Sequence, residues 1–215
     1  YMPALRGYMQ NAQKNLIEKL ADRRVWGYWH LENSWGNLDT NPDPTARDNI
    51  MYTGFAALQM SLYQRINGAD DYNRRGSLPL RHPNGKEFDA SLPALTDALQ
   101  QGAATSDFHL IACEPNWIFP LCNAIGAAAL KLAQPEVWTA QADHFRHALE
   151  REFIAANGRI LPCRSAYTGL AAPAIGGALT QALPVFFLNA LLPDIAARQW
   201  LTLRRDITHK DCLLY

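Results

Sequence analysis

Apolar residues recur every three or four positions in several long stretches of the chain, which is the period of an α-helix with one buried face. The first stretch covers residues 3–21, and a second covers residues 45–67 and ends at Asn67-Gly68, a typical helix stop. Later stretches predict helices over residues 88–102, 120–133, 135–156 and 178–192, followed by a last helix that begins at Asp194. The dominant pattern is helix pairs joined by long loops, which predicts an all-α protein.

Between these helices the pattern changes. Residues 25–44 interleave tryptophans with glycines and asparagines, a mixture that predicts a loop carrying an aromatic cluster. That cluster would either cover one end of a helical barrel or form a wall or mouth of a substrate site. Residues 70–86 are polar, with Pro83-Asn84-Gly85 as a hairpin-like turn. Residues 108–112 are predicted to be extended, and His109 within them is either exposed or reaches the site.

The chemically densest stretch of the chain lies between Cys113 and Cys122. Pro115 disfavours helix at the preceding residue, Glu114, and Pro120 suits the first turn of a helix. We therefore expect Cys113 to end an extended or loop segment and Cys122 to lie early in the next helix. This bend would let both sulfurs face one cavity.

The residues alone leave the role of these cysteines open, because a small core residue, a disulfide and a catalytic pair of thiols all fit the spacing. Glu114 and Asn116 would lie beside the sulfurs, and Trp117 would line the pocket. No metal site is predicted, because the chain has neither CxxC pairs nor an HExxH-type motif.

A second group of candidate residues lies at the head of the helix predicted over residues 45–67. Thr45 and Asp48 have the spacing of a capping box. Four residues at helical steps are predicted to share one face: Asp48, Met51, Tyr52 and Phe55. Asp48 is thus either a helix cap or a carboxylate that faces the cavity and serves as an acid or base.

Four sequence blocks carry a resemblance to a known family. They are Arg24–Trp29 (RVWGYW), Asp48–Gly54 (DNIMYTG), Cys113–Pro115 with Cys122–Asn123, and Ser165–Thr168 (SAYT). In order and spacing, over roughly residues 20–170, they resemble the linalool dehydratase/isomerase family. The resemblance implies an (α/α)6-type barrel or toroid, of which this chain would hold only a part. It also implies chemistry without metal or organic cofactor, in which an allylic terpene alcohol gains or loses water or isomerises.

The resemblance also implies which residues form the site. In that family, the residues that match Cys113 and Cys122 line the site near the substrate hydroxyl, together with those that match Met51 and Tyr167. The chain departs from the family at Phe55, where the family's enzyme has a histidine. An acidic residue and a tyrosine that act in that enzyme lie upstream of the residues present here.

The favoured hypothesis is a cofactor-independent hydro-lyase or isomerase that acts on a small apolar, terpenoid-like alcohol or alkene in a hydrophobic channel. The predicted catalytic residues are Cys113, Cys122, Tyr167 and Asp48. The predicted substrate-binding residues are Met51, Tyr52, Phe55, Glu114, Asn116 and Trp117. No metal and no cofactor are expected.

Two alternatives remain open from the sequence. The first is an α/α-toroid enzyme that acts on carbohydrate, with Asp48 and Glu114 as its carboxylate pair and the aromatic-rich stretch as a stacking surface. The second is a non-catalytic family member that binds a ligand, which Phe55 in place of the family histidine suggests. A wet, acidic cleft would favour the first alternative, and a dry, thiol-lined pocket would favour the terpenoid hypothesis.

Composition bounds these hypotheses. The formal net charge of the 215 residues is zero, so no nucleic-acid partner is expected, and no apolar run reaches the length of a membrane span. Residues 1–215 are expected to form a single domain that is incomplete at both ends. The four cysteines leave a periplasmic or cytoplasmic location open. A homo-oligomer is implied by the resemblance.

Overall fold

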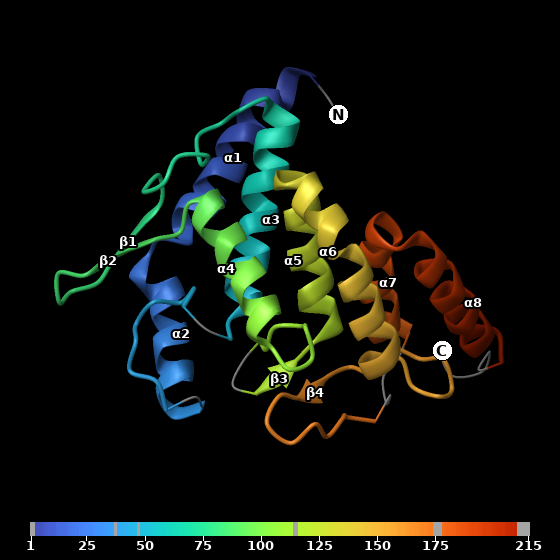
Figure 1. Cartoon of the computed structure of the whole chain (residues 1–215). Coiled ribbons are helices and arrows are strands. Elements are labelled where there is room, and N and C mark those ends of the chain that lie inside the picture. Colours follow the sequence, from blue (N-terminus) through green and yellow to red (C-terminus); the bar gives the residue numbers. More distant parts are fainter. Residues whose placement is uncertain (1–2, 37, 47, 114–115, 174–177, 210–215) are drawn as a thin grey trace.

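The computed structural model describes residues 3–36, 38–46, 48–113, 116–173 and 178–209, and helices dominate it (Figure 1). In chain order, the helices are α1 (Arg6–Lys19), α2 (Arg23–Gly36), α3 (Ile50–Asn67), α4 (Leu92–Thr105), α5 (Pro120–Ala133), α6 (Pro135–Ala148), α7 (Ala178–Leu191) and α8 (Pro193–His209). The prediction of an all-α protein is confirmed, because the described structure is mostly helical and its strands are short. Within the described ranges, no helix is long and apolar enough to cross a membrane.

The remaining elements are short. A 3-10 turn at Pro3–Leu5 precedes α1, and a π-helical turn at Leu149–Phe153 continues α6. Two small antiparallel sheets complete the described structure: β1 (Pro79–Arg81) with β2 (Glu87–Asp89), and β3 (Trp117–Ile118) with β4 (Arg164–Ser165). In the second sheet Trp117 lies opposite Ser165.

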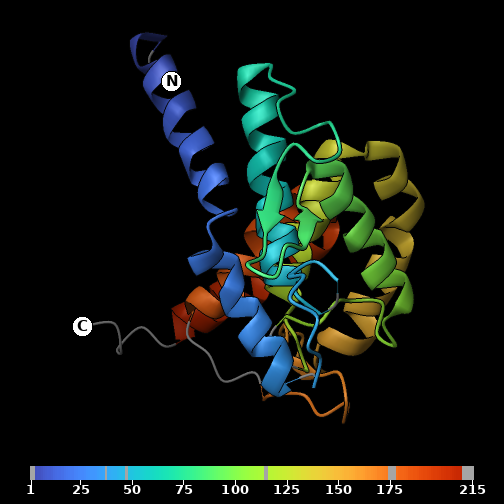
Figure 2. The same ribbon diagram turned by 90° about the vertical axis from the view of Figure 1, so that its left-hand side faces the viewer.

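The helices pack in consecutive pairs. α3 packs against α4, α5 against α6, and α7 against α8, while α5 also contacts both α3 and α7. In the side view, α4 and α6 lie on one side of α3, and α1 lies on the other (Figure 2). The buried apolar side chains form two clusters, one that includes Trp26, Tyr63 and Leu95 and one that includes Trp138 and Phe153.

α3 and α5 approach closely because each carries a glycine where they meet. A Cβ atom on Gly54 would lie 3.2 Å from Cα of Gly126, and one on Gly126 would lie 2.8 Å from Cδ1 of Ile50. This contact sets the relative position of the first turns of the two helices, in which Met51 and Cys122 lie.

The prediction of a loop over residues 25–44 is wrong for most of its length, because residues 23–36 form α2. Trp26, Trp29 and Asn33 are buried on one side of this helix, and the Trp26 ring packs edge-on against Phe88 at 6.4 Å between centroids. Glycine and asparagine have low helix propensity, but burial of the tryptophans outweighs it in this segment.

The expected start of α3 is also wrong, because the helix begins at Ile50 rather than near Thr45. Thr45 does not cap a helix with Asp48. Instead its N–H and hydroxyl both donate to the Asp43 carboxylate, while the Asp48 backbone is left-handed at φ 49°. The first N–H of α3, from Ile50, donates to a carbonyl outside the helix at 3.2 Å.

Three further boundaries differ from the predictions. The helix expected over residues 88–102 is shifted to Leu92–Thr105, and Phe88 lies in β2. Residues 108–110 form a turn and a bend rather than the start of an extended segment, with His109 left-handed at φ 55°, and residues 111–112 have no regular secondary structure. The helix expected over residues 135–156 ends as an α-helix at Ala148 and continues as the π-helical turn.

Boundaries marked by proline or glycine agree best with the predictions. α5 begins and ends at residues 120 and 133 as expected, with proline at its first position. α3 ends at Asn67, followed by Gly68 in the left-handed conformation at φ 65°. The turn at residues 83–85 is confirmed, because the His82 N–H donates to the Lys86 carbonyl at 2.8 Å across it.

The contact between α3 and α5 predicts a specific sensitivity to added volume. Gly54→Val is expected to lower the free energy of unfolding by about 2 kcal/mol, because the new side chain must push against the α5 backbone. For a chain of this size, that corresponds to a fall in Tm of about 4–8 °C in a thermal melt followed by circular dichroism. Gly7→Val is the matched control, since Gly7 lies in α1 with nothing within 4 Å of its Cβ position. Equal melting temperatures for the two variants would contradict the packing argument.

Candidate active site

The two central cysteines are brought together at the head of α5. The Sγ atoms of Cys113 and Cys122 lie 3.7 Å apart, which is van der Waals contact and well beyond the ~2.05 Å of a disulfide. Their exposed fractions are 2% and 7%. The disulfide that the spacing left open is therefore not formed, and the two thiols face one another inside the apolar core.

The local sequence explains how Cys113 and Cys122 meet although nine positions separate them. Pro120 opens α5, so Cys122 lies in its first turn, where unpaired backbone N–H groups favour negative charge. The Cys113 N–H donates to the Trp117 carbonyl at 2.7 Å, and Cys113 itself lies in a bend outside any helix. Cys113 before a helix and Cys122 early in α5 agree with the prediction, while Glu114 and Pro115 lie outside the described residues.

Asn123 fixes the loop that carries Cys113. Its side-chain Oδ1 accepts the Ile111 N–H at 2.8 Å, and its Nδ2 donates to the Ile111 carbonyl at 2.9 Å. The same Nδ2 lies 3.0 Å from the Phe119 carbonyl. Asn123 is 5% exposed, so these bonds lie inside the protein, where an unpaired amide is costly. Asn123 is not among the residues predicted from the sequence to form the site, although an asparagine on an apolar helix face beside a cysteine is a usable signal.

The predicted binding residues after Cys113 differ in how far they are exposed to solvent. Asn116 has a left-handed backbone at φ 76°, and its carbonyl accepts the Ala166 N–H at 2.6 Å. Its Oδ1 is buried without a hydrogen-bond partner among the residues that the structure describes. The side chain of Trp117 is 41% exposed. Glu114 lies outside the described residues.

Asp48 and Tyr167 lie on the same cavity, which has a volume of about 470 Å³. It is bounded by the residues before and in the first turn of α3, the second half of α4 and the turn after β4. Its lining is largely polar and includes Asn49, Thr53 and Ser106. The cavity therefore unites two of the predicted catalytic residues, a carboxylate and a phenol.

The thiols lie next to this cavity rather than in its lining. Ala112 lines the cavity and directly precedes Cys113, whereas neither cysteine is among the lining residues. The four predicted catalytic residues thus form two pairs, with Asp48 and Tyr167 in the cavity and the two thiols buried behind its wall.

The predicted apolar face of α3 is split in the structure. Asp48 lies before the helix begins, so it does not share a helical face with Met51, Tyr52 and Phe55. Tyr52 is buried, and its hydroxyl donates to the Leu20 carbonyl at 3.1 Å, so it joins α3 to the end of α1. Burial raises the pKa of this phenol well above its usual range. Phe55 is 38% exposed, and Met51 is partly buried beside the core cluster that contains both cysteines.

Metal-ligating side chains do not gather elsewhere in the described ranges. Across residues 3–209 with their gaps, no group of three or more His, Cys, Asp or Glu residues is arranged to hold a metal ion. The described site offers thiol, carboxylate and phenol groups, which can donate, accept and relay protons.

Thiol, carboxylate and phenol groups set in a mainly helical protein fit the class of acid–base enzymes. A sequence model of one family, described as linalool dehydratase/isomerase, matches residues 1–212. The chain therefore belongs to the linalool dehydratase/isomerase family, which points to a lyase or isomerase. The resemblance seen in the four sequence blocks is confirmed and extends over nearly the whole chain.

The bonds of Asn123 predict a coupled loss of stability and thiol burial. Asn123→Ala leaves the N–H and carbonyl of Ile111 unpaired, so the free energy of unfolding should fall by about 2–4 kcal/mol. In a background that lacks Cys163 and Cys212, the remaining thiols should also react faster with a disulfide reagent.

Asn157→Ala provides the control for this variant. The Oδ1 of Asn157 accepts a hydrogen bond from the Arg159 N–H in an exposed turn, so replacing Asn157 should change neither quantity appreciably. Unchanged thiol reactivity in folded Asn123→Ala would show that Asn123 does not hold the loop that carries Cys113.

Proposed function

We propose that this protein is a cofactor-independent hydro-lyase or isomerase that acts on a small apolar, terpenoid-like alcohol or alkene. The observation that carries the proposal is the buried thiol pair, held at 3.7 Å in a chain of the linalool dehydratase/isomerase family. A pair of thiols with no disulfide, fixed by a dedicated asparagine, is more than core packing requires.

The proposed reaction needs two proton transfers and a dry surrounding. In dehydration, the carbon–oxygen bond breaks as an acid protonates the leaving hydroxyl, which departs as water. A base then removes a proton from the neighbouring carbon, and that pair of electrons forms the double bond. In isomerisation, water instead adds at the other end of the allylic cation, and the base takes the proton that the added water gives up. Apolar walls exclude stray water from the cation-like transition state.

The residues have distinct roles in this proposal. Cys113 and Cys122 position the substrate hydroxyl and relay its proton. Asp48 and Tyr167 line the adjoining cavity and supply an acid–base group and a hydrogen-bond donor to a substrate that extends from that cavity to the thiols. Met51 and Phe55 extend an apolar surface from the same end of α3. Tyr52 has a packing role, because its hydroxyl already binds the end of α1.

The fold enters the proposal as part of an α/α toroid. The packing of α3 with α4, α5 with α6 and α7 with α8, joined through α5, is the order expected for neighbouring hairpins of such a ring. The N-terminal ends of α3 and α5 would then face the mouth of the ring, where the thiols lie.

One observation favours the alternative that the substrate is a carbohydrate. The cavity that holds Asp48 also includes Asp107, and hydroxyl and amide side chains make up much of its lining. A polar, acidic cavity suits a sugar better than a terpenoid. The two proposals therefore place the substrate differently, in the Asp48 cavity for a sugar and against the thiols for a terpenoid alcohol.

The test uses products identified by mass spectrometry after incubation with linear monoterpene alcohols and alkenes and with a set of glycosides. We expect gain or loss of water on a terpenoid, and Cys122→Ala should lower the rate by about 10²–10⁴-fold, as for loss of a proton-transfer group. Cys163→Ala is the matched control, since Cys163 lies in another segment and burial raises the pKa of its thiol. It should retain the rate of the unmodified protein.

Other outcomes separate the alternatives. Hydrolysis of a glycoside that Asp48→Asn abolishes and Cys122→Ala leaves intact would replace the terpenoid proposal by the carbohydrate one. If Cys122→Ala stays folded and turns over terpenoid at the full rate, the thiols have no part in the chemistry.

A further inference from the structure

A second cavity, of about 300 Å³, lies between α4, α5 and α6, and neither thiol nor Asp48 lines it. Its walls are buried apolar side chains: Ile50, Leu99, Ile111, Leu130, Trp138 and Phe145. An apolar cavity of about 150 Å³ is large enough for benzene, so this one suits a molecule about twice that size.

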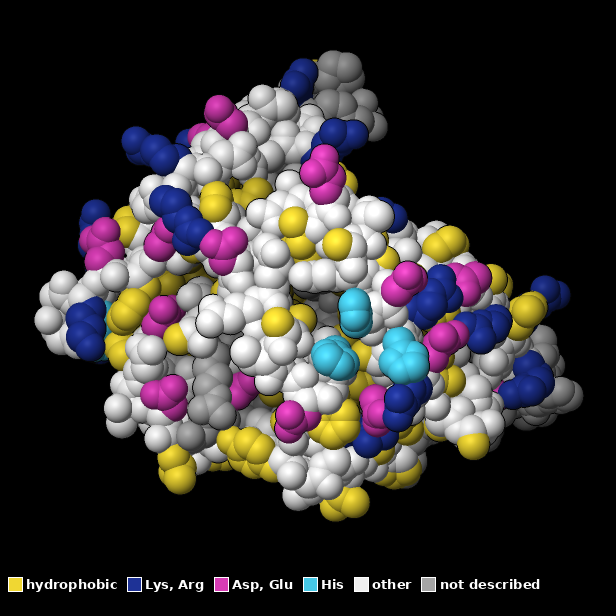
Figure 3. Space-filling model, in the orientation of Figure 1, with side chains coloured by type: hydrophobic (Ala, Val, Ile, Leu, Met, Phe, Trp, Pro, Cys, Tyr) yellow, Lys and Arg dark blue, Asp and Glu magenta, His cyan; other side chains and the backbone are white. Residues whose placement is uncertain are grey.

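Two histidines stand together at this cavity. The rings of His109 and His144 have centroids 6.4 Å apart, and both side chains are exposed lining residues. Neither imidazole has a hydrogen-bond partner within the part of the chain that the structure describes. Figure 3 shows histidine side chains gathered on the face formed by α4 and α6. The cavity lies at the same face, because His109 and His144 line it.

The position of His109 is fixed by its own turn. Its backbone is left-handed at φ 55°, a conformation that is uncommon for residues other than glycine. The Ser106 carbonyl accepts the His109 N–H at 3.0 Å. The Ser106 hydroxyl also donates to the Leu110 carbonyl. Hydrogen bonds to Ser106 therefore hold the backbone of both His109 and Leu110.

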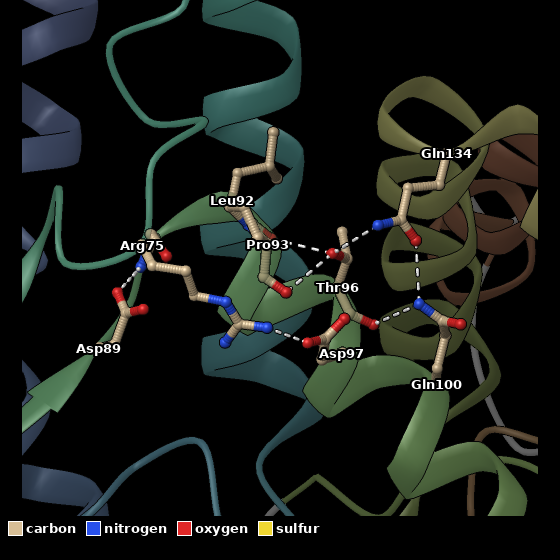
Figure 4. A network of polar contacts seen from close by, with 9 residues as sticks. Arg75, Asp89, Leu92, Pro93, Thr96, Asp97, Gln100 and Gln134 are labelled. Atoms are coloured by element: carbon tan, nitrogen blue, oxygen red, sulfur yellow. Dashed lines mark hydrogen bonds and ion pairs between the residues drawn. The ribbon is translucent and has the colours of Figure 1, made fainter.

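The spacing of α4 and α6 is fixed as well. Gln100 Nε2 donates to Gln134 Oε1 at 2.9 Å, and Gln134 Nε2 donates to the Thr96 hydroxyl at 3.2 Å (Figure 4). Gln134 directly precedes α6, so these bonds tie its start to α4. They also engage the amide of Gln100. The cavity is thus preformed, with largely apolar walls, and its polar lining residues include His109, His144 and Gln141.

We propose that this cavity binds a small aliphatic carboxylate, with the chain of about eight carbons between α4, α5 and α6 and the carboxylate on His109 and His144. Two neighbouring imidazoles can each donate an N–H to one oxygen of the same carboxylate, whereas a hydroxyl head cannot accept from both in the same forked geometry. Small-molecule sites have this composition, with largely apolar walls and a few polar groups that orient the ligand. The proposal does not depend on the terpenoid chemistry at the thiols.

The test measures binding of octanoate and 1-octanol to the full chain by isothermal titration calorimetry, with the fluorescence of Trp138 in the cavity wall as a second signal. We expect saturable binding at one site and an affinity for octanoate at least tenfold higher than for 1-octanol. His109→Ala/His144→Ala should remove that preference, because it removes both donors to the carboxylate.

A second variant tests the walls rather than the head group. Ala103→Leu, which fills the cavity from α4, should weaken both ligands at least tenfold. Ala140→Leu is its control, since Ala140 is exposed on α6 and does not line the cavity. It should leave both affinities unchanged.

The outcomes decide the proposal even if Ala103→Leu folds poorly, because the double histidine variant changes two exposed side chains and does not fill the cavity. Octanoate that fails to saturate at millimolar concentration, or that binds the double histidine variant unchanged, would overturn the site. Equal affinities for octanoate and 1-octanol would overturn the assignment of the carboxylate to the histidines.

Discussion

The paired hydrogen bonds between Asn123 and the backbone of Ile111 are the interaction on which the functional end of this protein depends. Asn123 lies next to Cys122 on α5, and Ile111 lies two residues before Cys113, so one amide side chain sets the distance between the thiols. Ile111 also lines both cavities. A polar bond inside an apolar core thereby positions the proposed catalytic pair and the wall shared by two potential ligand sites.

The sequence predicts best where single residues dictate the backbone. Pro120 starts α5 and Gly68 ends α3 because each has a backbone preference that needs no tertiary information. α2 could not be recognised in the same way. Its glycines and asparagines have low helix propensity, and what makes it a helix is the burial of Trp26 and Trp29 against residues far along the chain, among them Phe88.

The candidate site shows the same division. The approach of Cys113 and Cys122 followed from prolines between them, whereas the roles of Asn123 and Tyr52 depend on partners in other segments. Helical periodicity predicted that Asp48 shares a helix face with Tyr52. The helix begins two residues after Asp48, so the two residues do not share a helix face. Both cavities arise from the spacing of helices, which local sequence patterns do not encode.

Ile111 separates the two cavities, and its backbone is also the part of the loop that Asn123 binds. Its backbone is held by Asn123, and its side chain is confined by α4, where a Cβ on Gly102 would approach its Cδ1 to 2.9 Å. Because this one side chain lines both cavities, a rotation of it that widened the cavity of Asp48 would narrow the cavity of His109, and the reverse. A molecule bound in one cavity would therefore weaken binding in the other through the Ile111 side chain, although the two molecules would not touch.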